Sequence, residues 1–390
     1  MYGLLGEHLS HSWSPQLHKA MGGYDYDLFS VPPEELAQFL RTTPCLGLNV
    51  TIPYKKAVIP YCTALSPLAQ RLGSVNTLLR TPEGFYGDNT DYPGFLLLCQ
   101  GVPVKGAKAA VLGTGGAGVM AAQALRDCGA QVELVSRRGE CNYETMSRDV
   151  QIIVNATPVG MYPKEDASPI DLSQFPDCHT VIDLIYHPLR TRLILDAMAR
   201  GLRVRTGLSM LVEQARLAAE KFTGRSIEAV SIFREMENIV LIGMPGSGKT
   251  TIGKAIAEEL RRPFFDADEE FVKAYGDIPT FFRENGEAAF RARETEILRS
   301  LGQKTGIVLA TGGGAVTIPE NYPLLKQNGK LFWIQRPISD LPVEGRPVSM
   351  AQGVSDLCAK RLPLYEAWAD SIIENTTPAG AVHQLMEEWQ

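Results

Sequence analysis

The sequence has no cysteine pattern of the kind that disulfides or structural zinc sites require. Its seven cysteines are an odd number, none belongs to a CxxC pair, and no histidine stands at metal-ligand spacing from a cysteine. Cysteine used in this way is typical of a reducing compartment, so we expect a cytoplasmic protein without a disulfide framework.

Long apolar runs and an excess of basic charge are absent as well. No window approaches the roughly 18 apolar residues that span a bilayer, and the first residues lack the basic and apolar regions of a signal peptide. The formal net charge is −6, so no overall basic field attracts nucleic acid. We expect no membrane or nucleic-acid partner, and either a monomer or a homodimer.

Two glycine-rich loops are present, each between an apolar run and a helical pattern. The first is GTGGAG at Gly113–Gly118, and the second is GMPGSGKT at Gly243–Thr250. Such a strand, loop and helix point backbone N–H groups and the positive helix end at an anion. Strands that alternate with helices on both sides imply an α/β fold with largely parallel sheets. We expect three segments, at residues 1–100, 101–237 and 238–390.

The first segment has its own alternation of strands and helices. The pattern predicts strands at 2–6 and 46–53 and helices at 15–21 and 34–40. Helical spacing is also expected from Val204 to Glu237, with the second loop's strand starting near Asn238.

The second loop is a complete GxxxxGK[ST] motif. Its glycines let the backbone wrap a phosphate, Lys249 neutralises charge near the β/γ bridge, and the Thr250 hydroxyl coordinates Mg²⁺. The expected ATP-binding residues are Gly243, Gly246, Ser247, Gly248, Lys249, Thr250 and Thr251.

Further motifs follow this loop. An Asp266-Ala-Asp268 pair at a strand end would put one carboxylate near a metal and the other toward an acceptor. Two separate arginines, Arg291 and Arg361, suit an anionic acceptor, because guanidinium groups bind carboxylates bidentately. With the GGG run at 312–314 and the GRP motif at 345–347, this set resembles shikimate kinase over residues 238–390.

The resemblance implies a parallel-sheet P-loop domain like that of nucleoside-monophosphate kinases, and it implies residue roles. Asp268 would accept the proton of the acceptor hydroxyl, and Asp266 would support Mg²⁺ through water. Arg291 and Arg361 would hold the shikimate carboxylate. Gly312, Gly313 and Gly314 would line the substrate pocket. Arg346 would be the lid arginine, which reaches both ATP and the transferring phosphate.

One departure from the kinase pattern concerns the lid. Between Trp333 and Arg346 the chain is several residues shorter than in the family, and Pro337 and Pro342 interrupt a helical pattern. Because a closed lid excludes water, the shortening predicts an effect on turnover rather than on binding.

The first loop satisfies the GxGxxG pattern of a dinucleotide site. The strand that follows its helix ends in Ser136-Arg137-Arg138, where an NAD-selective site would place an acidic residue for the ribose 2′-hydroxyl. Two guanidinium groups would instead attract a 2′-phosphate, so the sequence predicts NADP(H).

Motifs around this loop resemble shikimate dehydrogenase over residues 1–235. They are SHSWSP at 10–15, NVTIPYK at 49–55, GSVNT at 73–77, GDNTD at 87–91, NATPVGM at 155–161 and MLVEQA at 210–215. The resemblance implies that the substrate carboxylate end would bind Ser12, Ser14, Thr51 and Tyr186, and that the ring hydroxyls would bind Asn76, Asp91 and Gln214, with Lys55 in the same substrate site. It implies an NADP site of Gly113, Gly115, Gly116, Ala117, Gly118, Ser136, Arg137, Arg138, Asn155, Thr157 and Met161.

A lysine beside a carboxylate has a chemical reason in this setting. Reducing a ketone needs a hydride on carbon and a proton on oxygen, and Lys55 paired with Asp91 could donate that proton and take it back. Two departures concern the cofactor: Cys141 stands where the family has a second arginine, and only 17 residues separate Arg137 from Asn155. We therefore expect an abbreviated Rossmann domain.

The two resemblances fit one another. A bifunctional chain would reduce 3-dehydroshikimate to shikimate with NADPH and then phosphorylate shikimate with ATP and Mg²⁺, on the route to chorismate and aromatic amino acids. Two alternatives stay open. The dehydrogenase could oxidise quinate with NAD, or one half could be a non-catalytic, regulatory nucleotide-binding module.

Overall fold

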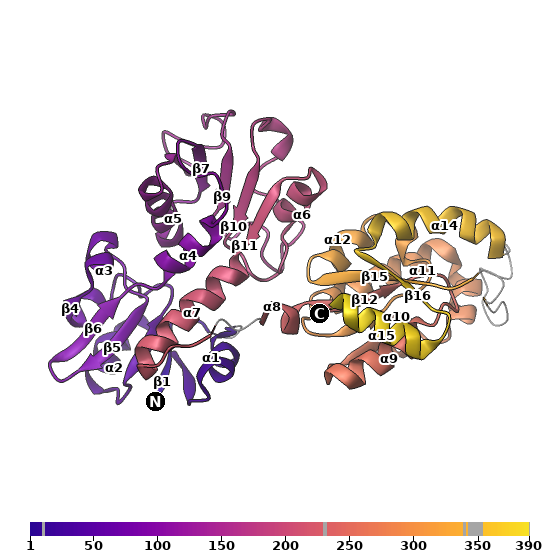
Figure 1. Ribbon diagram of the computed structural model, residues 1–390, viewed down its shortest axis with the longest axis horizontal. Helices are drawn as coiled ribbons and strands as arrows, with labels where there is room; N and C mark the ends of the chain where they lie inside the picture. Colours follow the sequence, from indigo (N-terminus) through magenta and orange to yellow (C-terminus); the bar gives the residue numbers. More distant parts are fainter. Residues whose placement is uncertain (10–11, 229–231, 338–340, 342–353, 390) are drawn as a thin grey trace. The chain divides into compact units, whose positions relative to one another are not determined.

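The computed structural model describes all residues except 10–11, 229–231, 338–340, 342–353 and 390. The described chain forms two compact units (Figure 1). The first comprises Met1–His187 and Thr191–Ile232, and the second comprises Pro188–Arg190 and Phe233–Gln390. Among the described residues, no helix combines the length and the apolar character that crossing a membrane requires.

The first unit begins with a mixed six-stranded sheet in the order β2-β1-β3-β5-β6-β4. Strands β3, β5 and β6 pair antiparallel, and the other pairs are parallel. The strands are β1 (Tyr2–Gly6), β2 (Tyr26–Ser30), β3 (Gly47–Val50), β4 (Cys62–Leu65), β5 (Thr77–Thr81) and β6 (Gly84–Asp88), and the helices are α1 (Ser14–Gly22), η1 (Pro33–Glu35), α2 (Leu36–Thr42), η2 (Ile59–Tyr61) and α3 (Pro67–Leu72).

The second sheet of this unit is fully parallel, in the order β11-β10-β9-β7-β8. Its central strand β9 is completely buried, as expected of a parallel strand covered on both faces. The elements are β7 (Lys108–Leu112), α5 (Gly116–Asp127), β8 (Gln131–Val135), β9 (Ile152–Asn155), η3 (Leu172–Gln174), β10 (Thr180–Asp183), α6 (Arg192–Ala199) and β11 (Arg203–Thr206).

Two helices, α4 (Asp91–Cys99) and α7 (Gly207–Thr223), pack against each other. Helix α4 also contacts α5 of the second sheet, and α7 also contacts α1 of the first. Gly224, at φ 67°, ends α7 in the left-handed conformation that glycine adopts without steric cost. The helix pair therefore links the two sheets of this unit.

The second unit has one parallel sheet in the order β13-β14-β12-β15-β16. Every residue of its central strand β12 is buried. The elements are α8 (Ile232–Met236, which starts at the unit boundary), β12 (Asn238–Ile242), α9 (Lys249–Leu260), β13 (Phe264–Asp266), α10 (Ala267–Tyr275), α11 (Ile278–Gly302), β14 (Val308–Ala310), η4 (Ala315–Thr317), α12 (Asn321–Lys326), β15 (Gly329–Gln335), α14 (Val354–Trp368), β16 (Ser371–Glu374) and α15 (Pro378–Trp389).

The α/β architecture with parallel sheets confirms the expected fold class, and most expected elements form. The prediction of one helical stretch from Val204 was wrong, because Arg203–Thr206 pairs with β10 as an edge strand. The strand expected at 46–53 is confined to Gly47–Val50. No helix lies between β8 and β9, a fully described stretch, as the short spacing predicted.

Candidate active sites

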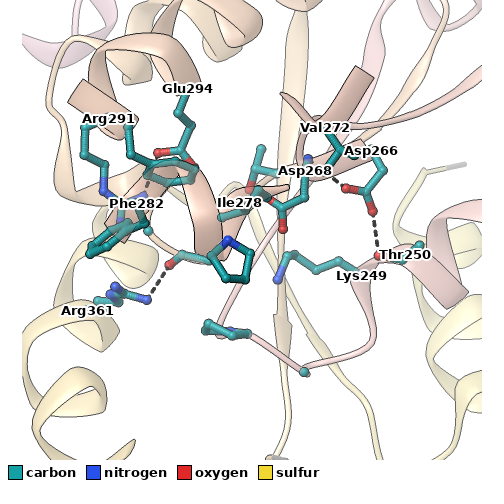
Figure 2. A pocket seen from close by; sticks show the side chains of 18 of the residues that line it. Lys249, Thr250, Asp266, Asp268, Val272, Ile278, Phe282, Arg291, Glu294 and Arg361 are labelled. Carbon is teal, nitrogen blue, oxygen red and sulfur yellow. Dashed lines mark hydrogen bonds and ion pairs between the residues drawn. The ribbon is translucent and has the colours of Figure 1, made fainter. Parts of the chain in front are cut away.

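The second unit contains a cavity of about 670 Å³ at the carboxyl end of its sheet (Figure 2). The cavity is lined by charged side chains of both signs and by apolar side chains such as Phe282 and Phe290. Its charged and hydroxyl-bearing lining residues are Lys249, Thr250, Thr251, Asp266, Asp268, Asp277, Arg291, Glu294, Thr311, Arg336 and Arg361.

The P-loop forms one wall of this cavity. Gly243, Gly246 and Gly248 have φ values of 147°, 81° and 99°, which L-residues rarely adopt. The Lys249 ammonium donates to the carbonyl oxygens of Gly243 and Met244 at 2.9 and 3.0 Å. These contacts hold the lysine inside the loop, where an incoming phosphate would meet it.

Thr250 and Asp266, the two predicted Mg²⁺ ligands, lie together. The Thr250 hydroxyl donates to the Asp266 carboxylate at 2.6 Å, and the same carboxylate caps α10 by accepting from the Asp268 backbone N–H at 3.0 Å. Hydroxyl and carboxylate oxygens are hard donors that suit Mg²⁺. Within the described ranges no cluster of three or more His, Cys, Asp or Glu side chains that could hold a metal ion is found.

Asp268 faces the cavity from the first turn of α10. Its side chain is exposed to the cavity, and desolvation by the surrounding cavity walls, together with the nearby carboxylates of Asp266 and Glu294, raises its pKa to about 6. The cations of Lys249 and Arg291 partly oppose the shift. A carboxylate of this kind is ionised at neutral pH and still basic enough to accept a proton.

The two predicted carboxylate-binding arginines are both buried at the other end of the cavity (Figure 2). Arg291 pairs with Glu294 at 2.7 Å, and Arg361 donates to the Gly313 carbonyl at 3.1 Å. A Cβ atom at Gly314 would overlap the Arg291 guanidinium. The glycine run therefore permits the close approach of the arginine.

Sequence reasoning missed Glu294, which is 3% exposed and lies three residues after Arg291 on α11. The three-residue spacing from Arg291 could have indicated Glu294 in the sequence, since residues three apart on a helix lie on the same face. Arg336, which also lines the cavity and donates to the Gly246 carbonyl at 3.4 Å, was missed too. The predicted lid arginine, Arg346, lies outside the described residues.

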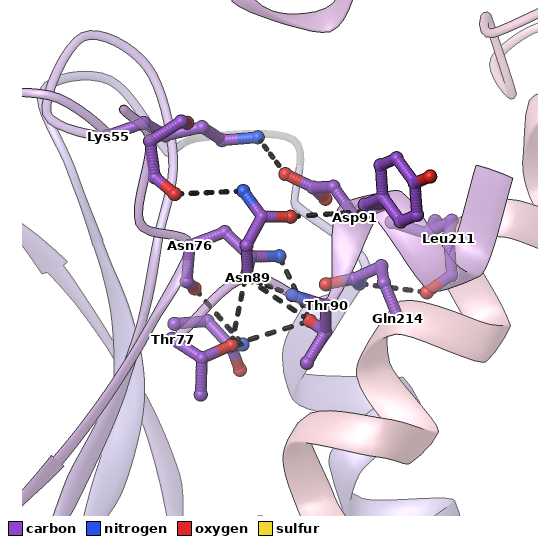
Figure 3. A network of polar contacts seen from close by, with 11 residues as sticks. Lys55, Asn76, Thr77, Asn89, Thr90, Asp91, Leu211 and Gln214 are labelled. Atoms are coloured by element: carbon purple, nitrogen blue, oxygen red, sulfur yellow. Dashed lines mark hydrogen bonds and ion pairs between the residues drawn. The ribbon is translucent and has the colours of Figure 1, made fainter. Parts of the chain in front are cut away.

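In the first unit, Lys55 and Asp91 form an ion pair at 2.6 Å (Figure 3). Lys55 follows β3, and Asp91 is the first residue of α4. Their side chains are 29% and 14% exposed, so the pair is accessible to a substrate while Asp91 stays largely shielded from water.

The neighbouring polar side chains are fixed by hydrogen bonds among themselves (Figure 3). Asn76 donates to the Thr90 hydroxyl at 3.0 Å and accepts from the Thr90 backbone N–H at 2.7 Å. Gln214, on α7, donates to the Leu211 carbonyl at 2.8 Å. The residues expected to contact ring hydroxyls thus gather beside the Lys55–Asp91 pair.

The hydroxyl groups expected at the carboxylate end lie on three segments. The Ser12 hydroxyl donates to that of Ser14 at 3.2 Å at the start of α1, Thr51 follows β3, and Tyr186 follows β10. Sequence reasoning missed Tyr26, a buried residue whose hydroxyl is influenced by the Ser14 side chain.

Tyr26 connects this end to the rest of the site. Its hydroxyl donates to Asn49 at 2.8 Å, and the Asn49 amide reaches the Asn76 carbonyl at 3.5 Å. Tyr26 and Asn49 therefore connect β2 and β3 by hydrogen bonds to the segment that carries Asn76.

The predicted dinucleotide loop joins β7 to α5. Gly113 has a φ of 105°, and a Cβ atom at Gly118 would overlap the Gly113 carbonyl oxygen, so helix and strand pack at a distance only glycine allows. Beside the loop is a cavity of about 620 Å³, lined by Thr114, Ser136, Arg137, Arg138 and Gly139. Both arginines are exposed there, as a site for a 2′-phosphate requires.

Asn155, expected in the NADP site, has a fully buried side chain that bonds within the protein. Its amide donates to the Asp183 carboxylate at 3.1 Å, and its oxygen accepts from the Thr157 hydroxyl at 2.7 Å. Burial raises the pKa of Asp183 to about 6. Asn155 is thus placed to hold the loop that carries Thr157. Met161, also expected in the NADP site, is 44% exposed.

Together the fold and the two sites define a nucleotide-dependent α/β enzyme, with a lysine–carboxylate pair and a dinucleotide loop in one unit and a P-loop cavity in the other. Residues 4–78 match the family model described as shikimate dehydrogenase substrate binding domain, and residues 245–389 match that described as shikimate kinase.

Curated relatives and solved structures resemble the first part of the chain. The shikimate dehydrogenase (NADP(+)) of Thermus thermophilus is 38% identical over 244 residues, covering 57% of this chain and 92% of that protein. The structure of a chorismate mutase/shikimate 5-dehydrogenase fusion protein from Clostridium acetobutylicum has a TM-score of 0.56 and 38% identity, over 58% of this chain and 91% of that one. Shikimate 5-dehydrogenase from Thermus thermophilus, in complex with NADP(H) and shikimate, has a TM-score of 0.54 and 35% identity, over 58% and 95%.

The chain belongs to the shikimate dehydrogenase family and carries a shikimate kinase domain in its C-terminal part. It is an enzyme of the shikimate pathway that combines both families, which confirms the resemblance drawn from the motifs. The roles of individual residues and the boundaries at 1–100, 101–237 and 238–390 stay predictions.

Proposed function

We propose that this chain catalyses two consecutive reactions: NADPH-dependent reduction of 3-dehydroshikimate to shikimate, and ATP-dependent phosphorylation of shikimate at its 3-hydroxyl. The observation that carries the proposal is that one chain holds both a Lys55–Asp91 pair in a polar site and a P-loop cavity with two buried arginines. The product of the first reaction is the acceptor of the second.

In the reduction, Lys55 donates a proton to the carbonyl oxygen of the substrate. Bound NADPH supplies the hydride. Asp91, 2.6 Å from the ammonium, keeps Lys55 oriented for the transfer. Asn76 and Gln214 orient the ring hydroxyls, and the hydroxyls of Ser12, Ser14, Thr51 and Tyr186 bind the carboxylate. Arg137 and Arg138 bind the 2′-phosphate of the cofactor, which favours NADPH over NADH. This preference for NADPH favours the reduction of 3-dehydroshikimate over the alternative reaction, which is quinate oxidation with NAD.

In the phosphorylation, Asp268 accepts the proton of the 3-hydroxyl as its oxygen attacks the γ-phosphate. Arg291 and Arg361 hold the carboxylate at the far end of the cavity, and Lys249 stabilises the charge on the transferring phosphoryl group. Thr250 and Asp266 would hold Mg²⁺, which neutralises phosphate charge when bound. Arg346 is the proposed lid arginine.

The test is a coupled assay of the full-length protein with 3-dehydroshikimate, NADPH and MgATP, following NADPH oxidation and formation of shikimate 3-phosphate. Lys55→Ala should lower reduction about 10²- to 10⁴-fold, as expected for loss of a general acid, and leave phosphorylation of added shikimate intact. Lys249→Ala should abolish the phosphorylation of shikimate and leave the reduction of 3-dehydroshikimate intact. The neighbouring exposed lysines offer matched controls, since Lys56→Ala and Lys254→Ala should leave both rates unchanged.

Two outcomes would contradict the proposal. A wild-type protein that binds ATP without forming shikimate 3-phosphate would support the alternative of a regulatory module. Loss of both activities in either folded lysine variant would contradict independent sites. A cytoplasmic location, proposed from the cysteine usage, and the choice between monomer and homodimer need separate measurements.

A further inference from the structure

Four aromatic rings of the first unit form a continuous row, which we call the aromatic row: Tyr186, Trp13, His187 and Tyr162. The Trp13 ring centroid lies 5.4 Å from that of Tyr186 and 5.3 Å from that of His187, and His187 lies 4.7 Å from Tyr162. The interplanar angles are 56°, 66° and 67°. Tilted and edge-to-face pairs at these separations are mutually attractive.

The row joins segments that are far apart in the sequence. Trp13 is the N-cap residue of α1, beside the first sheet, whereas Tyr186 and His187 follow β10 and Tyr162 follows β9 in the second sheet. Ligands of parallel α/β sheets bind at the carboxyl ends of their strands. Trp13 therefore bridges the segment that opens the substrate-binding part and the loops at the ligand-binding edge of the cofactor part.

Trp13 also sits within the residues proposed for the substrate carboxylate. Ser12 and Ser14 flank it in the chain, and their hydroxyls are 3.2 Å apart. Tyr186, the proposed partner from the other segment, is in direct ring contact with Trp13. The Trp13 ring thus contacts Tyr186, and the Trp13 backbone is bonded directly to Ser12 and Ser14.

From this geometry we propose that Trp13 is a positioning residue for dehydrogenase substrate binding, an inference that rests on the proposed function. Its ring holds the Tyr186 hydroxyl and the Ser12–Ser14 segment at a fixed separation before the substrate arrives. Without the ring, both groups would have to be ordered on binding, and that ordering reduces affinity.

The effect should fall on substrate binding rather than on the chemical step. The Lys55–Asp91 pair keeps its own contact at 2.6 Å, and Asp91 is anchored at the start of α4. An interaction that is equal in the ground state and the transition state changes KM and leaves kcat alone. Trp13→Ala should therefore raise KM for 3-dehydroshikimate about tenfold, equivalent to about 1.4 kcal/mol, with kcat and KM for NADPH within about twofold of wild type.

The experiment compares steady-state kinetics of full-length wild type, Trp13→Ala and Trp13→Phe, with hydrogen-exchange protection of the β1 and β3 peptides as the measure of a folded first unit. Trp13→Phe keeps a ring against Tyr186 and should restore KM to within about threefold of wild type. An unchanged KM in Trp13→Ala, or parallel losses in kcat and both KM values, would overturn the inference. Absence of 3-dehydroshikimate reduction in the wild type would instead refute the proposed function.

A double-mutant cycle with Tyr186→Phe tests whether Trp13 acts through the tyrosine. If it does, Trp13→Ala should raise KM by a much smaller factor in the Tyr186→Phe background than in wild type, because the hydroxyl to be positioned is already gone. Strictly multiplicative effects would refute this route. If Trp13→Ala does not fold, the same cycle with Trp13→Leu, which fills space without an aromatic face, decides between the two outcomes.

Discussion

The buried histidine beneath the dehydrogenase site makes a quantitative prediction about pH. His18 is 1% exposed, its ring stacks on Tyr26 at 3.9 Å and 7°, and its Nδ1 hydrogen bonds the Tyr24 hydroxyl at 2.5 Å. Burial lowers its pKa from 6.5 to about 3, with a hydrogen bond to Asn49 partly opposing the shift. His18 is therefore neutral in the folded protein throughout the physiological range.

The sign and the size of the effect follow from proton linkage. Because the unfolded chain binds a proton on this side chain below pH 6.5 and the folded chain does not, stability is full above that pH and falls as the pH decreases toward about 3. Between pH 8 and pH 5, His18 alone should lower the free energy of unfolding by about 2 kcal/mol.

Hydrogen exchange of β1 and β3 peptides across a urea series reports the unfolding of this unit in the full-length protein. The comparison is wild type against His18→Phe, which preserves a flat ring against Tyr26 and removes the titrating group. Other ionisable groups contribute equally to both proteins, so they cancel in the difference. Between pH 8 and pH 5, the free energy of unfolding of the wild type should fall by about 2 kcal/mol more than that of the variant. Equal losses in the two proteins would refute the reasoning.

Two further predictions concern the proposed active sites. Because Asp268 must be ionised to accept a proton and its pKa is raised to about 6, kinase kcat/KM should rise with pH through that value, and Asp268→Asn should lower kcat about 10²- to 10⁴-fold; a profile that is flat from pH 5 to 7 would contradict this. Replacing Arg137 and Arg138 together by serine should raise KM for NADPH at least about tenfold and leave KM for NADH unchanged, since charge-assisted bonds to a 2′-phosphate are lost; equal changes for both cofactors in initial-rate measurements would contradict it.

Local sequence was sufficient for the elements that carry both nucleotide loops. In each case an apolar strand, a glycine turn and a helix are contiguous, so one short window contains the whole structural unit. Val204–Thr206 was misassigned because the edge strand Arg203–Thr206 has only four residues, two of them arginines, and contains no apolar run. Its strand state depends on pairing with β10, which no local pattern encodes.

The supporting residues of the sites were harder to foresee than the residues expected to touch ligands. Glu294 could have been found by helical spacing from Arg291. Tyr26 and Asp183 could not, because their partners Asn49 and Asn155 lie 23 and 28 residues away. Tyr26 and Asn49 are on β2 and β3, which are separated by β1, and Asp183 and Asn155 are at the ends of the paired strands β10 and β9. Motif matching alone assigned Asn155 to the cofactor, whereas its side chain is committed to Asp183 and Thr157.

The two proposed sites would bind the same substrate carboxylate by different physical means, and their surroundings explain the difference. The dehydrogenase site offers neutral hydroxyls, with its cation already paired to Asp91. The kinase cavity must hold a polyphosphate as well, and charged groups of both signs line it. There the buried Arg291 is balanced by Glu294, so its guanidinium is desolvated at lower cost and stays oriented before the acceptor arrives. Removing Glu294 would leave the buried Arg291 with only its longer contact, at 3.4 Å, to the half-exposed Glu287. Its charge would then be poorly balanced, so stability would fall, and selectivity for the acceptor over other anions, ATP included, would fall with it.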